Sequence, residues 1–130
     1  MDDGMFRRLI GKAMEAREFA YAPYSRFRVG AALLTKSQKI YTGCNVESAS
    51  FSPTTCAERV AILKAVSEGE KDFSIIAVVG SGTDYAAPCG VCRQLLYEFA
   101  PALTVVIAKN PDEYQSFALS ELLPMGFGPE

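Results

Sequence analysis

The sequence predicts an α/β fold: a three-layer α/β/α sandwich with a mixed five-stranded sheet. Short apolar runs typical of buried strands alternate with segments whose apolar residues recur at three- and four-residue spacings, as on one face of a helix. An opening strand pair is followed by strands that alternate with helices, which indicates a mixed, mainly parallel sheet covered on both faces. Since 130 residues can bury a sufficient core without disulfides, we expect one domain, residues 1–130.

The first third of the chain predicts one helix and one hairpin. Helical spacing connects Phe6, Leu9, Ile10, Ala13, Ala16 and Ala20, and Pro23 ends the pattern. The stretches "FRVGAALLT" and "KIYTGCN" follow, separated by a polar turn at residues 36–38. We expect them to form two paired strands.

The remainder predicts two helices, two buried strands and a short tail. One helix follows an N-cap at Thr54 or Thr55, ends at Gly69, and has an apolar face of Val60, Ile62, Leu63 and Val66. The next opens at Pro88 or Cys89, turns Leu95, Leu96 and Phe99 inward, and ends at Pro101. "FSIIAVVGS" and "LTVVIAK" are the buried strands, and the tail offers one short strand and a helical turn.

Charge and hydropathy exclude several classes of partner. Thirteen Lys and Arg residues against 15 Asp and Glu residues give a formal net charge of −2, so no basic face for nucleic acid is expected. The N-terminal segment lacks the continuous apolar core of a signal peptide, and no run is long enough to span a membrane. We therefore expect a cytoplasmic protein.

The chain contains four cysteines and no histidine. The absence of histidine excludes Ser-His-Asp, Cys-His and His-ligand schemes, so acid-base chemistry must use carboxylates, thiols or a metal-activated water. Cys89 and Cys92 form a CxxC motif at a helix start, where helix amides favour thiolates. That motif alone is equally compatible with a metal site and with a thioredoxin-like disulfide.

Cys56 favours the metal site. It also lies at a predicted helix start, so two helices could direct three thiolates at one point. Three protein ligands with one open position are typical of catalytic zinc, whereas a structural site uses four. Cys44 is the possible fourth ligand, but its place in a strand is more typical of a small buried side chain.

Glu58 has two interpretations. In "TCAE" it could form a capping box with Thr55. That interpretation leaves the neighbouring cysteine and the distant CxxC unexplained, whereas a carboxylate beside zinc can move protons to and from a water whose pKa the metal lowers to about 7. We therefore predict that Glu58 is the general acid/base.

The motifs "CAE" and "PCGVC" form the signature of zinc nucleobase deaminases in a three-cysteine version. The whole chain resembles the small, homotetrameric, zinc-dependent cytidine deaminases, through "YAPYSRFRVGAAL", "GCNVESASFSPTTCAER", "PCGVCRQ" and "ELLPMGFGPE" in order. The resemblance implies zinc bound by Cys56, Cys89 and Cys92. It also implies hydrolytic deamination of cytidine and 2′-deoxycytidine to the uridines and ammonia, in pyrimidine salvage.

The resemblance implies further site residues. Phe27 would stack on the base, and Asn45 and Glu47 would bind the ribose 3′-hydroxyl, although a strand core residue and a polar strand end are the simpler interpretations. The backbone of Ala57, with that of Cys89, would meet the carbonyl and amino edges of the base.

Other implied residues act across subunits or through the ligands. Phe51 and Phe127 match positions that reach a neighbouring subunit's site, so a homotetramer with shared sites is expected. Many family members have tyrosine at the position of Phe51. This chain therefore lacks a hydroxyl group that would contact the 5′ end of the sugar. Arg59 resembles an arginine that donates hydrogen bonds to a ligand sulfur, which would offset the negative charge of three thiolates around zinc.

Four rival functions remain at this stage: a blasticidin S deaminase, an RNA-editing deaminase, a thiol-disulfide oxidoreductase built on "CGVC", and a non-enzymatic zinc-stabilised module. The sequence "NVE" and Phe27 favour a plain nucleoside over blasticidin S, and the charge balance disfavours RNA.

Overall fold

The computed structural model describes residues 3–129. Its elements, in chain order, are α1 (Asp3–Arg17), β1 (Val29–Thr35), β2 (Ile40–Cys44), α2 (Ala57–Ser67), β3 (Phe73–Gly80), α3 (Gly90–Phe99), β4 (Thr104–Asn110), β5 (Glu113–Ala118) and α4 (Leu119–Leu122). Every helix and strand expected from the sequence is present. In this part of the chain no helix is long and apolar enough to cross a membrane.

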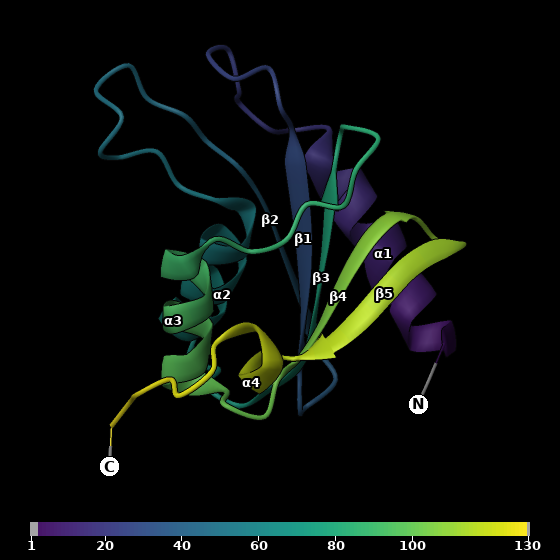
Figure 1. Ribbon diagram of the computed structural model, residues 1–130, viewed down its shortest axis with the longest axis vertical. Coiled ribbons are helices and arrows are strands. Elements are labelled where there is room, and N and C mark those ends of the chain that lie inside the picture. The colour runs from purple at the N-terminus through teal and green to yellow at the C-terminus, as the bar shows by residue number, and fades with distance from the viewer. Residues whose placement is uncertain (1–2, 130) are drawn as a thin grey trace.

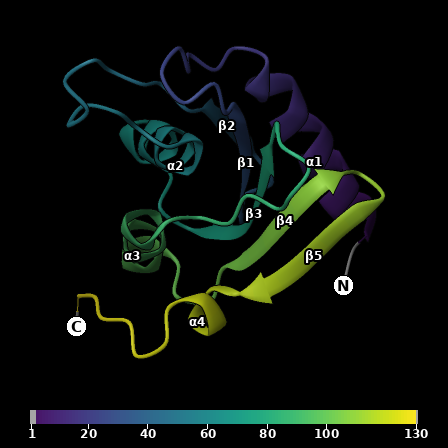
Figure 2. The same ribbon diagram turned by 45° about the horizontal axis from the view of Figure 1, so that its top comes forward.

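The five strands form one mixed sheet in the order β2-β1-β3-β4-β5. Helix α1 covers one face, and α2 and α3 cover the other, so the predicted three-layer arrangement is confirmed (Figures 1 and 2). The expectation of a mainly parallel sheet is wrong. Only β3 and β4 are parallel, because α3 crosses between them, whereas β2 and β5 join their neighbours through tight antiparallel turns and β1 runs antiparallel to β3.

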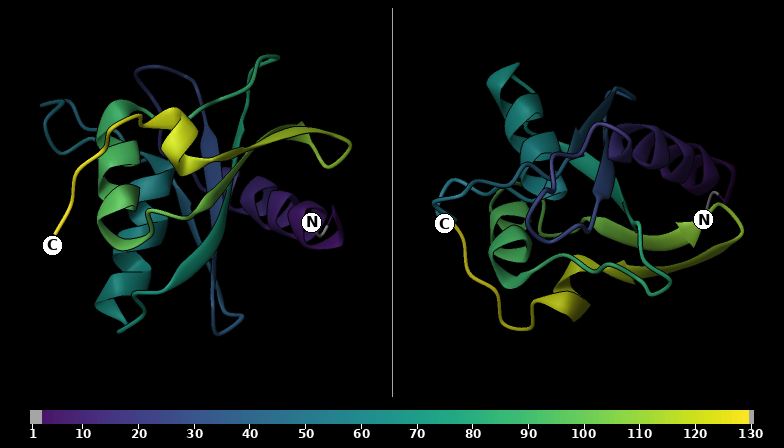
Figure 3. Two further views of the ribbon diagram at one scale, coloured as in Figure 1. Left: turned by 60° about the horizontal axis from the view of Figure 1, so that its bottom comes forward. Right: turned by 90° about the horizontal axis from the view of Figure 1, so that it is seen from above.

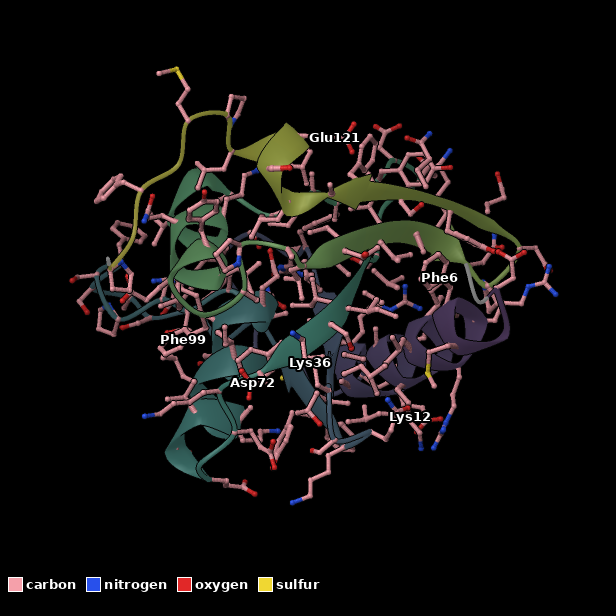
Figure 4. The ribbon with its side chains drawn as sticks, turned by 90° about the horizontal axis from the view of Figure 1, so that it is seen from below. Phe6, Lys12, Lys36, Asp72, Phe99 and Glu121 are labelled. Carbon is pink, nitrogen blue, oxygen red and sulfur yellow. The ribbon has the colours of Figure 1, made fainter. Side chains whose placement is uncertain are left out.

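The central strands are buried on both faces, and their residues alternate between two cores. Leu33, Ile76 and Val105 point to the α2 and α3 side, and Leu34, Ala77 and Val106 point to the α1 side. At the outer edge of the α1 side, Phe6 meets the Tyr114 ring edge-on (Figure 4). This period-2 alternation makes the sheet a rigid support for whatever its ends carry.

Two helix boundaries differ from the predictions. Helix α1 ends at Arg17, well before Pro23. Helix α2 is capped by Cys56 instead of Thr54 or Thr55, and its buried side is mainly alanine, with Leu63 48% exposed. The reason is a close approach to β2: a Cβ atom on Gly43 would lie 2.5 Å from the Ala57 carbonyl oxygen, so large side chains do not fit between the two elements.

Three long connections gather at one end of the sheet (Figure 1): residues 18–28, 45–56 and 81–89. The N-termini of α2 and α3 open toward the same end, as the view from above shows (Figure 3). The opposite end has short turns, and two of them are joined where the Lys36 amide donates to the Asp72 carbonyl at 2.9 Å (Figure 4). The loop-bearing end is therefore where a site can form.

Candidate active site

Three cysteine sulfurs converge where α2 and α3 begin. Cys56 and Cys89 are the N-caps of the two helices, with extended backbone at φ −70°, ψ 154° and φ −71°, ψ 171°. Cys92 follows in the first turn of α3. The Sγ atoms of Cys56 and Cys89 lie 3.9 Å apart, those of Cys89 and Cys92 3.4 Å apart, and all three lie within 4.8 Å of one another.

This cluster fits a zinc ion. Tetrahedral zinc with Zn–S bonds near 2.3 Å needs sulfurs about 3.8 Å apart, close to the observed spacing. Cys56 and Cys89 also line a cavity, which leaves room for a fourth ligand on that side. Cys44 is not in the cluster and lines a different hollow, between α1, β2 and α2.

The surroundings favour a thiolate at Cys56. The pKa of Cys56 falls to about 5, first because of its hydrogen bond with the Cys92 thiol and then because of Arg59. The pKa of Cys92 rises, because its proton is shared with Cys56 and because the side chain is buried. The positive ends of two helix dipoles add to the attraction for negative sulfur. Cys56 therefore favours the thiolate form, which binds a cation.

The adjacent cavity has a volume of about 400 Å³. Its wall combines residues from all three long connections and from the starts of β1 and α2: Ser25, Phe27, Val29, Asn45, Glu47, Thr54, Thr55, Cys56, Ala57, Glu58, Val78, Tyr85, Ala86, Ala87 and Cys89. Most of the residues predicted from the sequence are therefore brought to one space, although they lie far apart along the chain.

Glu58 is a buried carboxylate in this cavity, only 4% exposed. Its pKa is raised to about 7, mainly by burial and to a smaller extent by the charge of Cys56. The capping-box interpretation is wrong, because the N-cap is Cys56, which makes no side-chain cap, and the Thr55 hydroxyl donates to the Pro53 carbonyl at 2.9 Å. A carboxyl group with a pKa near 7 can both accept and release a proton at neutral pH.

Phe27 is not a strand core residue. It precedes β1, is 38% exposed, and its ring lies against Gly80 and Gly82, where a Cβ would come within 2.6 and 3.0 Å of ring atoms. Asn45 and Glu47 line the cavity as predicted, but both side chains also bind backbone: Asn45 accepts from the Val29 amide at 2.8 Å.

Two predicted residues lie outside the cavity of their own chain. Phe51 and Phe127 are each 75% exposed. Phe51 has φ 63° and lines a smaller hollow with Tyr24 and Glu47. The C-terminal tail runs beside α3 (Figure 3). There, Gln94 Nε2 of α3 donates to the Phe127 carbonyl at 2.8 Å. Within residues 3–129, nothing places these two rings against the thiol cluster.

Arg59 turns back toward the cluster from the first turn of α2. Its Nη2 donates to the Thr54 carbonyl at 3.1 Å and to Cys56 Sγ at 3.7 Å. Its Nε is buried and finds no hydrogen-bond partner among the residues described. The side chain therefore contacts a sulfur of the cluster instead of facing solvent.

Sequence reasoning missed several cavity residues. Tyr85 lines the cavity, and the ammonium of Lys109 lies 4.8 Å from its ring centroid. An aromatic residue four positions before a CxxC motif was the available signal. Ser25, in "YSRF", carried no signal, because its partner Glu47 lies 22 positions away.

The fold and the site fit one class of protein, the α/β/α zinc hydrolases, because three thiols positioned to hold a metal ion lie beside a buried carboxylate. Residues 6–109 match the family model described as the cytidine and deoxycytidylate deaminase zinc-binding region. The chain belongs to this family, and the resemblance read from its motifs is confirmed.

Relatives agree over nearly the full length. A protein named cytidine deaminase from Halalkalibacterium halodurans is 50% identical over 123 residues, covering 94% of this chain and 93% of the relative. The crystal structure of cytidine deaminase from Burkholderia pseudomallei has 46% identity and a TM-score of 0.87, covering 92% of this chain and 97% of that one. The corresponding structure from Mycobacterium tuberculosis has 38% identity and a TM-score of 0.80, covering 94% and 96%.

Proposed function

We propose that this protein is a zinc-dependent cytidine deaminase that hydrolyses cytidine and 2′-deoxycytidine to the corresponding uridines and ammonia. The observation that carries the proposal is a cluster of three thiols, two of which line a cavity of nucleoside size together with the buried Glu58. The names of the relatives support cytidine as the substrate. We further propose a single domain, acting in the cytoplasm in pyrimidine salvage.

The chemistry divides between the metal and Glu58. Cys56, Cys89 and Cys92 would hold zinc, which when bound supplies a Lewis acid that makes water nucleophilic near neutral pH. Glu58 takes a proton from the attacking water and delivers it to N3 of the cytosine ring as the C4–O bond forms. It then takes the remaining proton from the new C4 hydroxyl group and passes it to the 4-amino group, so that the C4–N bond breaks, ammonia leaves and the C4 carbonyl of the uridine forms. A pKa of about 7 suits Glu58 to both directions of transfer.

The rest of the cavity would bind the nucleoside. Phe27 offers an aromatic face for the base, and the buried Ala57 offers its backbone to the base edge. Asn45 and Glu47 would receive the ribose 3′-hydroxyl. Each still has unused hydrogen-bonding capacity after its contacts within the protein are counted.

Phe51 and Phe127 would complete the site of a neighbouring subunit, in a homotetramer. Both rings are exposed on their own chain, which supports a role outside it. A mixture of a Glu58→Gln chain and a Phe127→Ala chain should regain part of the activity after subunit exchange. If exchange is demonstrated and activity stays at the level of the separate variants, each chain holds a complete site.

The direct test is to incubate purified, zinc-loaded protein with cytidine and to follow ultraviolet absorbance, released ammonia and zinc per chain, with Glu58→Gln as the control. We expect one zinc per chain and loss of cytidine absorbance only with the parent. Bound zinc with no turnover of either cytidine substrate would indicate a zinc-stabilised module. Turnover of blasticidin S alone, or insulin reduction without zinc, would indicate one of the other rival functions.

A further inference from the structure

The backbone of Phe27 is held on both sides by side chains of other residues. Its N–H donates to the Ser25 hydroxyl at 3.1 Å, and its carbonyl accepts from Asn45 Nδ2 at 2.8 Å. Phe27 lies before β1, outside any helix or strand. Two side chains therefore satisfy the backbone N–H and carbonyl of Phe27, which in a strand residue would be paired with a neighbouring strand.

The Ser25 hydroxyl is in turn fixed by Glu47. It donates to Glu47 Oε2, while Glu47 Oε1 accepts from the amides of Tyr24 and Ser25 at 3.0 and 3.1 Å. The hydrogen bond from the Ser25 hydroxyl, with those amides, lowers the pKa of Glu47 and keeps it ionised. A continuous chain of bonds thus runs from the Glu47 carboxylate through Ser25 to Phe27.

Ser25, Asn45 and Glu47 differ in the number of hydrogen-bond donors and acceptors that they have left for a ligand. Ser25 has one hydroxyl proton, and Glu47 uses it, so Ser25 has no proton to donate to a ligand. Glu47 accepts three of about four possible bonds, and Asn45 uses one of its two N–H donors. Asn45 and Glu47 can therefore bind a ligand and hold the loop together, whereas the Ser25 hydroxyl keeps no donor and one free lone pair, and its main contacts are with Glu47 and Phe27.

The position of the Phe27 ring leaves little tolerance. One edge of the ring lies so close to Gly80 and Gly82 that even a methyl group on either glycine would collide with it or crowd it. Phe27 also lines the cavity. A small displacement of the Phe27 backbone would move the ring into the cavity or away from a bound base.

We propose that Ser25 is a positioning residue, whose hydroxyl transmits the placement of Glu47 to Phe27 and so sets the aromatic surface that receives the base. This inference rests on the proposed function, because it takes Phe27 as the stacking surface for a pyrimidine. It assigns Ser25 no contact with substrate.

The test compares Ser25→Ala with two matched variants. Ser25→Thr keeps the hydroxyl on an exposed side chain. Ser81→Ala removes a hydroxyl that accepts from the amide of Arg28, next to Phe27, at 3.0 Å but has no link to Glu47. For Ser25→Ala we expect KM for cytidine, and Kd for uridine by calorimetry, to rise about tenfold with kcat within about twofold. Ser25→Thr and Ser81→Ala should stay within about threefold of the parent. Equal penalties for Ser25→Ala and Ser81→Ala would reduce the effect to general loosening and overturn the proposal.

A double-mutant cycle separates positioning from direct contact. If Ser25 acts through Phe27, Ser25→Ala should cost almost nothing in a Phe27→Ala background, whereas a direct contact with substrate would give additive penalties and overturn the proposal. A parent that binds and deaminates cytidine while Ser25→Ala matches it would refute the Ser25 role alone. A zinc-loaded parent that neither binds uridine nor deaminates cytidine would refute the proposed function itself.

Discussion

The two walls of the cavity are built in different ways. On the metal side, Cys92 and Glu58 are buried, and the ends of two helices hold them against the core. On the nucleoside side, Ser25, Phe27 and Glu47 lie in loops outside any helix or strand. Hydrogen bonds made by side chains hold these loops in place. The difference suggests that core packing supports the chemistry, whereas a polar network supports recognition. Changes on the first wall should affect metal and rate, and changes on the second should affect binding.

The largest effect is expected from removing a thiol on the metal side. Cys56→Ala should lose zinc and essentially all deaminase activity, because two sulfurs cannot hold the ion as three can. Cys44→Ala is the matched control, since Cys44 lies outside the cluster. The measurement is the zinc content of each variant by elemental analysis. The assignment is refuted if Cys44→Ala loses the metal while Cys56→Ala keeps it in full.

Replacing Glu58 by Gln should remove turnover while keeping metal. The amide preserves the shape of the side chain but cannot carry a proton, and one residue serves several transfers, so kcat should fall by about 10⁴-fold or more. Zinc content and uridine binding should stay near those of the parent. A variant within about tenfold of the parent rate would leave Glu58 without a role in proton transfer.

Burial of Glu58 also predicts how the metal-free protein responds to pH. Because burial raises the folded-state pKa from its usual 4.5 to about 7, the folded state favours the protonated form. The resulting stability is fully present below pH 4.5 and is lost as pH rises through 7, a change that approaches about 3 kcal/mol. Urea unfolding after zinc removal should therefore show a free energy of unfolding that falls with pH in the parent more than in Glu58→Gln. Parallel pH curves would contradict the burial argument.

The contrast between the walls also explains what the sequence could predict. Helix periodicity and apolar runs predicted the elements. The places of Cys56, Cys89 and Cys92 at two helix starts predicted the cluster, because each helix start is marked by its own local pattern although 33 positions separate Cys56 from Cys89. The share of parallel strands was mispredicted, since it depends on which strands are joined by tight turns and which by a crossover helix. The cap of α2 was mispredicted, since it depends on close packing such as that of Gly43 against α2. Ser25 was missed because its partner Glu47 is 22 positions away and nothing local marks the pair.

Arg59 tests how the metal side is tuned. Arg59→Gln should retain zinc, because all three thiols remain, but lose about 10- to 100-fold in activity. The positive charge near Cys56 would be gone, so the attacking water loses its proton less readily. The acidic limb of the pH–rate profile should therefore move to higher pH. Arg59→Lys is the companion variant, as it keeps the charge without the planar donor group. An unchanged profile in Arg59→Gln would show that the helix N-termini suffice.

The smallest effect should come from the nucleoside side, where one residue has two uses. Asn45→Ala removes the bonds that hold the Val29 amide and the Phe27 carbonyl, as well as any contact with the ribose. Its KM penalty should be roughly 10- to 30-fold for cytidine and only partly smaller for 3′-deoxycytidine, because a lost hydroxyl contact accounts for about 0.5 to 1.5 kcal/mol. The part that persists measures positioning of Phe27, and the part that disappears measures recognition of the sugar. Equal penalties on both substrates would remove Asn45 from ribose binding, and a penalty confined to cytidine would mean that Phe27 keeps its place without Asn45.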